Sequence, residues 1–274
     1  MNDYIPVLIL NVLYISYDGL LEPLGQSQVL AYLEKLAVKN KISLISFEKK
    51  NNLTDQSQKD KLRARLRTVH VTWIPLRYHR SPSFIATAMD VAVGAFVATC
   101  ISLIRRPDIL HARSYVPALI ALVIKRVTGA KFVFDMRGFW ADERTDGGLW
   151  PENGGLYRLT KWFERRFLVA ADHVVTLTYS SLVPLRAMHP QVKKLPPITV
   201  IPTCVDLERF APVGIIRPRE EFTLGYAGSL GTWYLLDEML AVFKVLQGCR
   251  RDAKLLIVNR NEHAEVEAAA AKLG

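Results

Sequence analysis

The sequence predicts an α/β protein built on parallel β-sheets with crossover helices. Short apolar runs alternate with longer helical patterns along almost the whole chain, and this alternation is typical of parallel strands joined by right-handed crossovers. Half of the 274 residues are hydrophobic and 23% are charged. That composition suits one large globular α/β domain or two smaller ones.

The first part of the chain contains seven apolar runs that predict strands. They cover residues 7–16, 42–47, 69–75, 109–111, 131–135, 173–177 and 198–201. Helical periodicity fills most of the gaps between them, at 26–39, 83–105, 116–128, 155–170 and 179–188. We therefore expect one complete α/β domain over residues 1–202.

A proline-containing stretch of mixed charge, 203–221, interrupts this rhythm and predicts an interdomain linker. Strand-like runs at 222–227 and 254–258 then alternate with helical patterns at 235–246 and 262–273. Two strands and two helices are too few to complete a second domain. The expectation is that residues 222–274 form the first part of a truncated C-terminal domain.

The cysteines and the N-terminus predict a cytoplasmic protein. Cys100, Cys204 and Cys249 are far apart, with neither metal-site spacing nor a disulfide pattern. Asp3 lies where a signal peptide would be basic, and no small-residue cleavage site follows the first apolar run.

Residues 83–104 have the length of a membrane span, but Asp90, Ser102 and several small residues dilute their hydrophobicity. A buried or membrane-facing helix is the preferred interpretation over a spanning one. The net charge of +10 favours an anionic partner, although a solvated basic face explains each small basic cluster equally well. Because no nucleic-acid-binding motif accompanies the charge, we expect an anionic membrane surface and no nucleic acid as partner.

Parallel sheets bind ligands beyond the carboxyl ends of their strands, so the residues that follow each strand are the candidate site. After the first strand, Gly19 and Gly25 let the backbone approach a ligand, and a helix beginning near Gln26 directs free N–H groups toward it. A plain turn remains the alternative. His111 is expected to end the fourth strand, where it has either a functional role or a structural one.

The richest stretch follows the fifth strand: DMRGFWADERTDGGLWPENGG, from Asp135 to Gly155. Carboxylates suit sugar hydroxyls, arginines suit phosphates and flat aromatic rings suit sugar faces. A long loop within a compact domain is usually functional, which makes Asp135, Arg137, Asp142 and Glu143 candidates. The alternative is a solvated loop held together by its own ion pairs.

The stretch GYAGSLGTWY, 225–234, resembles an anion cradle, because glycines follow an apolar run and precede a helical pattern. The sequence has no GxGxxG, GxxxxGK[ST], GxSxG or HExxH motif. Dinucleotide redox chemistry, P-loop phosphoryl transfer, ester hydrolysis and zinc proteolysis therefore lack support.

Five fragments in order resemble the bacterial retaining glycosyltransferases of family 4: LYISYDGLLEPLGQSQVLAYLEKLA, DILHARSY, DMRGFWADER, IPTCVDLERF and GYAGSLGTWYLLDEM. The resemblance implies the GT-B fold, in which two Rossmann-like domains face a cleft. It implies a nucleotide-sugar donor and a glycan or lipid-linked acceptor at the inner face of the plasma membrane. It also implies transfer with retention in cell-surface polysaccharide synthesis, without a metal or other cofactor.

The resemblance assigns a role to each candidate residue. His111 would face the transferred sugar, and Asp135, Arg137, Asp142 and Glu143 would lie where the acceptor hydroxyl enters. Backbone near the donor diphosphate would come from two segments, Gly25–Gln26 and, in the second domain, Gly228, Ser229 and Gly231.

Two departures from the family pattern qualify this picture. Ser229 and Tyr234 stand where many members carry the arginine and lysine that neutralise the diphosphate. The paired glutamates, eight positions apart, that bind donor sugar and ribose have no counterpart in this sequence. The expected function is glycosyl transfer, and the alternative is a non-catalytic acceptor- or membrane-binding fragment of such an enzyme.

Overall fold

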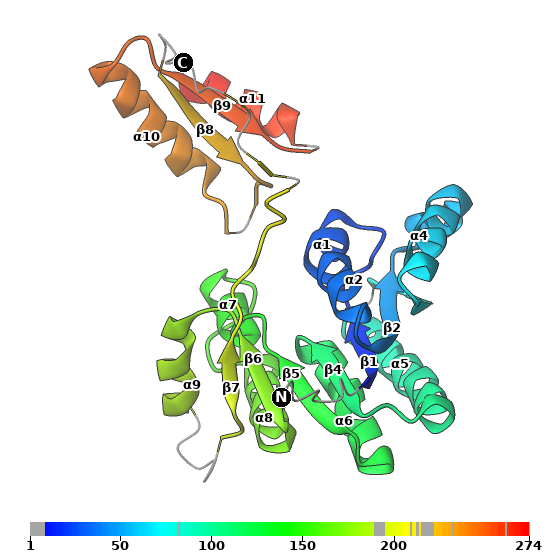
Figure 1. Cartoon of the computed structure of the whole chain (residues 1–274). Coiled ribbons are helices and arrows are strands. Elements are labelled where there is room, and N and C mark those ends of the chain that lie inside the picture. The colour runs from blue at the N-terminus through cyan, green and yellow to red at the C-terminus, as the bar shows by residue number, and fades with distance from the viewer. Residues whose placement is uncertain are drawn as a thin grey trace, which may run out of the picture. The chain divides into compact units, whose positions relative to one another are not determined.

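A computed structural model of the chain describes residues 9–81, 83–188, 195–208, 210–211, 214, 222–231, 233–260 and 262–273. The chain divides into two compact units, Met1–Asp206 and Leu207–Gly274 (Figure 1). They are called unit 1 and unit 2 and are described separately.

Unit 1 is built on a sheet of seven strands in the order β3-β2-β1-β4-β5-β6-β7, and all neighbours pair in parallel. The strands are β1 (Asn11–Ser16), β2 (Lys41–Glu48), β3 (Val71–Arg77), β4 (Ile109–Arg113), β5 (Lys131–Asp135), β6 (His173–Thr176) and β7 (Ile198–Val200). The strand order reverses between β1 and β4. That reversal is the switch point at which open parallel sheets bind ligands.

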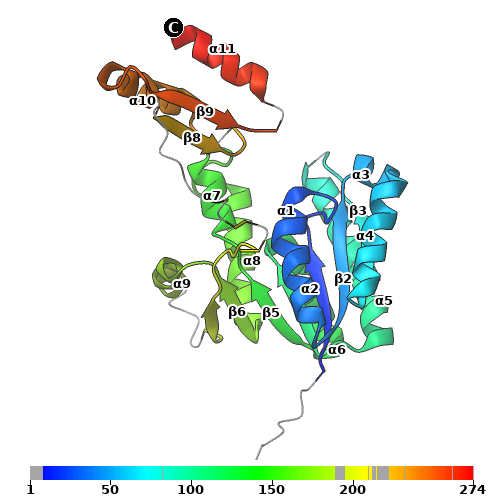
Figure 2. The same cartoon turned by 45° about the horizontal axis from the view of Figure 1, so that its top comes forward.

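Helices cover both faces of this sheet (Figure 2). In chain order they are α1 (Pro23–Gly25), the π-helical turn η1 (Gln26–Leu30), α2 (Ala31–Ala37), α3 (Lys50–Thr54), α4 (Gln56–Thr68), α5 (Ser83–Arg105), α6 (Tyr115–Thr128), α7 (Trp140–Asp146), α8 (Gly155–Ala170), the 3₁₀ turn η2 (Tyr179–Ser181) and α9 (Leu182–Met188). Segments α1, η1 and α2 follow one another without a break.

Two apolar cores lie on opposite faces of the sheet because side chains alternate along each strand. Leu13 and Ile15 of β1 pack into the core that α5, α6 and α8 cover. Tyr14, between them, packs into the core formed with Leu33 of α2 and Leu62 of α4. The predicted parallel α/β fold is confirmed, and every strand of the sheet coincides with a predicted apolar run.

Among the described residues of unit 1, helices α3, α4 and α7, and the short α1 before Gln26, lie outside the predicted helical patterns. The helix α4 buries only Leu62 and Leu66 and is otherwise strongly polar, so its hydrophobic periodicity is too weak to detect. Helix α7 lies inside the stretch that was expected to be a continuous loop.

Unit 2 contains two parallel strands, β8 (Thr223–Ala227) and β9 (Lys254–Val258), paired from Thr223 with Lys254 to Ala227 with Val258. Helices α10 (Leu236–Cys249) and α11 (His263–Leu273) follow the two strands. Both strands and both helices match the predicted pattern to within three residues at each end.

Candidate functional site

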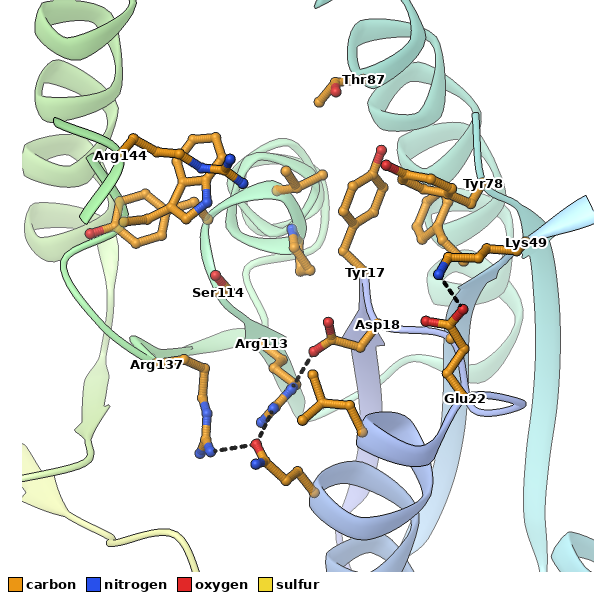
Figure 3. Close-up of a pocket in the computed structure, with 18 of the residues that line it drawn as sticks. Tyr17, Asp18, Glu22, Lys49, Tyr78, Thr87, Arg113, Ser114, Arg137 and Arg144 are labelled. Carbon is orange, nitrogen blue, oxygen red and sulfur yellow. Dashed lines mark hydrogen bonds and ion pairs between the residues drawn. The ribbon is translucent and has the colours of Figure 1, made fainter. Parts of the chain in front are cut away.

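A cavity of about 690 Å³ lies at the carboxyl-terminal edge of the unit 1 sheet (Figure 3). All seven strands contribute lining residues at or just beyond their ends: Tyr17, Asp18, Phe47, Lys49, Tyr78, Arg113, Arg137, Leu177 and Thr203. The cavity therefore occupies the position that the topology of a parallel sheet assigns to a ligand.

At the switch point, Arg113 joins β4 to the loop that follows β1. Its Nε lies 2.9 Å from Asp18 Oδ2, and the side chain of Arg113 is only 4% exposed. A buried guanidinium needs compensating partners, because desolvation of an unpaired charge is costly. Arg113 is thus a fixed positive charge in the cavity lining.

The side-chain oxygen of Gln28 accepts hydrogen bonds from two arginines. Its Oε1 accepts hydrogen bonds from Arg113 Nη2 at 2.9 Å and from Arg137 Nη2 at 3.1 Å (Figure 3). Gln28 lies in the π-helical turn η1, and π-turns are frequent at functional sites. Because Gln28 is neutral, it orients both guanidinium groups without cancelling their charge.

Asp135, the last residue of β5, lies behind this arginine pair and is 5% exposed. Its Oδ2 is 3.6 Å from His111 Nε2 and 3.9 Å from Arg113 Nη1. Burial opposes ionisation, but His111 first, and then Arg137 and Arg113, outweigh it and hold the pKa of Asp135 below its usual value. Asp135 is therefore a carboxylate at neutral pH.

His111 packs against Tyr14, with ring centroids 4.4 Å apart. The His111 Nε2 and the Asp135 Oδ1 are buried atoms without a hydrogen-bond partner among the described residues, and the 3.6 Å between the two side chains exceeds a hydrogen bond. Two groups that sequence reasoning selected are thus adjacent and incompletely satisfied, as is common at functional sites.

The lowered pKa of Asp135 predicts a pH-dependent stability difference from Asp135→Asn. A carboxyl whose pKa is lowered in the folded state stabilises the fold at pH values above its pKa in the unfolded chain, which is near 3.8. It loses that contribution as the pH falls through the folded value. Urea unfolding from pH 7 to pH 3 should show wild type more stable than Asp135→Asn at pH 7, with the gap closing in acid. A gap that is constant with pH would refute the assigned ionisation.

Aromatic side chains form the cavity walls. On one side, Tyr17 lies 4.9 Å from Phe47 and 5.3 Å from Tyr78, ring centroid to centroid. On the other, Trp140 and Trp150 meet edge to face at 5.1 Å. Flat rings of this kind bind the apolar faces of sugars, and arginines near them bind anionic groups.

Further charged groups line the cavity near these rings. The guanidinium of Arg144 lies 5.4 Å from the Trp140 ring centroid, and Lys49 Nζ pairs with Glu22 Oε1 at 2.6 Å. In total, four cationic and two anionic described side chains line the cavity. An anionic ligand would therefore be favoured.

Asp142 belongs to a polar network beneath the loop. It accepts hydrogen bonds from Tyr157 at 2.9 Å and from Lys161 at 3.0 Å. Lys161 also contacts the fully buried Glu164 at 2.7 Å, whose other oxygen accepts the hydroxyl of Tyr115 at 2.5 Å. Asp142 is absent from the described cavity lining, so its geometry favours anchoring the loop to α8, as in the alternative interpretation.

Glu143 lies against Gly138, where a Cβ would come 2.2 Å from Glu143 Oε1. Burial, with the neighbouring Asp142 and Asp146, raises the pKa of Glu143 despite the opposing Arg144. A raised pKa suits proton transfer, but Glu143 is also absent from the described lining. Its predicted role at the acceptor remains untested.

The first glycine loop is fixed by close packing and a buried carboxylate. A Cβ on Gly25 would come 2.0 Å from the Gly19 carbonyl oxygen, so this helix start packs directly on the loop backbone. Glu48, fully buried, accepts the backbone N–H groups of Leu20 and Leu21 at 2.7 and 3.2 Å. Gln26 is exposed, and Gly25 has a packing role that the donor-binding prediction had not included.

Two backbone N–H groups of the predicted anion cradle in unit 2 already donate hydrogen bonds within that unit. The Gly228 N–H donates to Val258 O at 3.1 Å, which corrects the expectation that this group is free for a diphosphate. Leu230 N–H donates to Glu262 Oε2 at 3.0 Å, and the Ser229 carbonyl accepts the Tyr226 hydroxyl. Gly231 has φ of 129°, a conformation that glycine adopts readily.

The predicted site residues did not include Asp18, Gln28 or Arg113, which line the cavity. All lie within or beside motifs that were recognised, YDGLLEPLGQSQ and HARSY. Within the described residues, no group of three or more His, Cys, Asp or Glu side chains could hold a metal ion. Metal-independent chemistry stays a prediction.

The fold of this chain resembles that of several solved structures. The sucrose-phosphate synthase of Thermosynechococcus elongatus aligns over 95% of this chain and 73% of its own, with a TM-score of 0.63 and 14% identity. Anabaena Alr3699/HepE in complex with UDP and glucose aligns over 97% and 67%, with a TM-score of 0.58 and 12% identity. A UDP-N-acetylglucosamine 2-epimerase aligns over 96% and 67%, also with a TM-score of 0.58 and 12% identity.

The chain thus spans about two thirds of the length of the solved structures that it resembles. At these identities the likeness shows the fold alone, which is of the GT-B type. No curated protein matches the sequence. The sequence from residue 29 to residue 209 matches the family model described as Glycosyltransferase Family 4. That match covers most of the chain, which therefore belongs to Glycosyltransferase Family 4.

Proposed function

We propose that this protein transfers a sugar from a nucleotide-sugar donor to a hydroxyl of a glycan or lipid-linked acceptor, with retention of configuration. The observation that carries the proposal is the arginine pair, Arg113 and Arg137, held by Gln28 at the switch point between aromatic walls. Family membership supports glycosyl transfer, and a role in cell-surface polysaccharide synthesis is the context proposed for it.

The cationic and aromatic side chains of the cavity suit a ligand that carries both an anionic group and sugar rings. Arg137 and Arg144 can contact an anionic group, while Tyr17, Tyr78 and Trp140 can face sugar rings. We assign the cavity to the acceptor. The donor would be a nucleoside diphosphate sugar, as supported by the UDP bound to the Anabaena structure.

In the proposed reaction, the bond between the anomeric carbon and the diphosphate oxygen breaks while the acceptor hydroxyl attacks from the same face. Attack from the same face gives retention without a side-chain nucleophile, and the acceptor proton passes to the departing diphosphate. Stabilisation of the developing negative charge by preorganised groups would provide much of the rate.

The experiment is a turnover assay of the whole chain with a panel of nucleotide sugars and with glycan and glycolipid acceptors. Release of nucleoside diphosphate, dependent on acceptor, would support transfer, and NMR of the product would report the anomeric configuration. A folded chain that releases none with any pair would instead support the alternative, a non-catalytic acceptor- or membrane-binding module. An inverted product would contradict retention alone.

Arg137→Ala is expected to reduce turnover by about one to two orders of magnitude while leaving the fold intact. Loss of a hydrogen bond to a charged group costs about 1.5–3 kcal/mol, which converts to that change in rate. Arg158→Ala is the matched control, because Arg158 is exposed on α8 and, within the described residues, donates a local hydrogen bond to Asn153 O. Equal turnover rates in Arg137→Ala and Arg158→Ala would show that Arg137 has no role in the reaction.

A further inference from the structure

Helix α5 has an inverted packing pattern, with small and polar residues facing the protein and large apolar residues facing outward. The residues that it buries recur every four positions and are small or polar: Ala86, Asp90, Gly94, Ala98 and Ser102. The residues that it exposes between 84 and 104 are all uncharged: Phe84, Ile85, Ala88, Met89, Ala92, Val93, Phe96, Cys100, Leu103 and Ile104. Helices of soluble proteins normally show the opposite pattern.

The inward stripe explains how α5 is held on unit 1. A Cβ on Gly94 would come 2.6 Å from Ile120 of α6 and 2.9 Å from Phe47 of β2, so the helix approaches its neighbours closely. Asp90, 1% exposed, accepts the Tyr17 hydroxyl at 2.7 Å and His79 Nδ1 at 2.6 Å. One face of α5 is thus fixed to the protein by close packing and hydrogen bonds.

The outward face carries large apolar side chains, whose exposure to water is unfavourable. Phe96 is 72% exposed and Ile104 is 81% exposed. Residues 84–105 are long and apolar enough to cross a membrane, yet only 22% of the relevant window is buried in the protein. A contiguous apolar face of this size usually marks an interaction surface.

The charges at the ends of the helix identify the partner. Arg77 and Arg80 are exposed before α5, and Arg105 and Arg106 are exposed at its end. The nearby Asp108 is engaged by the Asn11 backbone N–H at 2.8 Å. Two copies of this face packed together would bring basic ends against basic ends in either orientation, whereas an anionic bilayer would attract both ends.

We infer that the outer face of α5 is a membrane-docking surface that lies in the headgroup region of an anionic bilayer. The helix rests parallel to the surface, because its other face is fixed to the sheet and to α6. Apolar side chains enter the acyl boundary while the terminal arginines contact lipid phosphates. Thr87 of the same helix lines the cavity, so docking brings the cavity wall close to the bilayer.

The inference is tested by flotation of the whole chain with vesicles of phosphatidylcholine, with or without phosphatidylglycerol. Wild type should float with the anionic vesicles, and added salt should weaken this binding. Phe96→Glu should reduce the binding at least about ten-fold, because it places a charge in the acyl boundary. Arg80→Gln with Arg106→Gln should reduce binding to anionic vesicles by roughly ten-fold.

Val245→Glu is the matched control, since Val245 is 71% exposed on α10 of unit 2; it should bind as wild type does. Binding of Phe96→Glu at the wild-type level, or absence of wild-type binding to either vesicle, would overturn the inference. So would a dimer of the wild-type chain in light scattering that Phe96→Glu converts to a monomer, because the occupant would then be a second copy. None of these outcomes depends on transferase activity.

Discussion

Replacement of Arg113 by methionine is expected to lower kcat/KM of transfer by at least about two orders of magnitude. Arg113 is a buried cation that contacts Asp18 and Gln28 at 2.9 Å and lies 3.9 Å from Asp135. Without it, Gln28 loses one of its two donors, and the Gln28 side chain that accepts from Arg137 is no longer held by Arg113. A single lost charge-assisted contact costs about 1.5–3 kcal/mol, and loss of orientation adds to this.

The same substitution should also destabilise unit 1. Removal of one partner from a buried charged cluster typically costs about 3–5 kcal/mol, because the remaining charges lose compensation. Arg113→Lys separates the two effects: it keeps the charge but cannot donate to Asp18 and Gln28 in the same geometry. We expect Arg113→Lys to retain most of the stability and to lose turnover. Wild-type kcat/KM in a folded Arg113→Lys or Arg113→Met would contradict this role.

Gly25→Ala is expected to lower the free energy of unfolding by about 3 kcal/mol or more, since overpacking against backbone forces the chain to move. The new Cβ would lie 2.0 Å from Gly19 O and 2.9 Å from Leu20 Cα. No rotamer relieves this contact, because the backbone alone sets the position of a Cβ. The loop that would shift carries Tyr17, Asp18 and Glu22 of the cavity wall.

Gly155→Ala provides the control for this prediction. Gly155 begins α8, and a Cβ there would meet nothing within 4 Å. Its stability should change by less than about 1 kcal/mol. Urea denaturation of the three proteins measures both effects. If Gly25→Ala were as stable as wild type and only bound donor less well, Gly25 would serve ligand approach rather than packing.

The location of the site could be predicted from the sequence, because parallel strands collect their carboxyl ends at one edge. His111 lies in β4, Asp135 ends the neighbouring β5 and Arg137 follows β5, and the structure brings the three together. Gly25 was selected as a position where the backbone approaches a ligand, and donor binding there stays a prediction. The approaching group, however, is the protein's own loop at Gly19.

Side-chain directions within the loops could not be predicted. Asp142 shares a motif with Arg137, yet it faces α8, because Tyr157 and Lys161, four positions apart on that helix, converge on its carboxylate. Gln28 was not predicted as a site residue. Its role depends on two arginines at the ends of β4 and β5 and on a π-helical turn, and none of these leaves a pattern in the sequence around Gln28. The inverted packing of α5 was hidden for the same reason, since composition does not show which residues face inward.

Hydrogen exchange with and without a bound glycosyl acceptor tests most directly whether the cavity at the switch point is the acceptor site. The acceptor used is one that supports nucleoside diphosphate release in the turnover assay. Slower exchange is expected in three segments that line the cavity, residues 17–22, 113–117 and 137–150, and the effect should disappear in Arg137→Ala. Protection confined to other parts of the chain, or equal protection in Arg137→Ala, would show that the acceptor binds elsewhere.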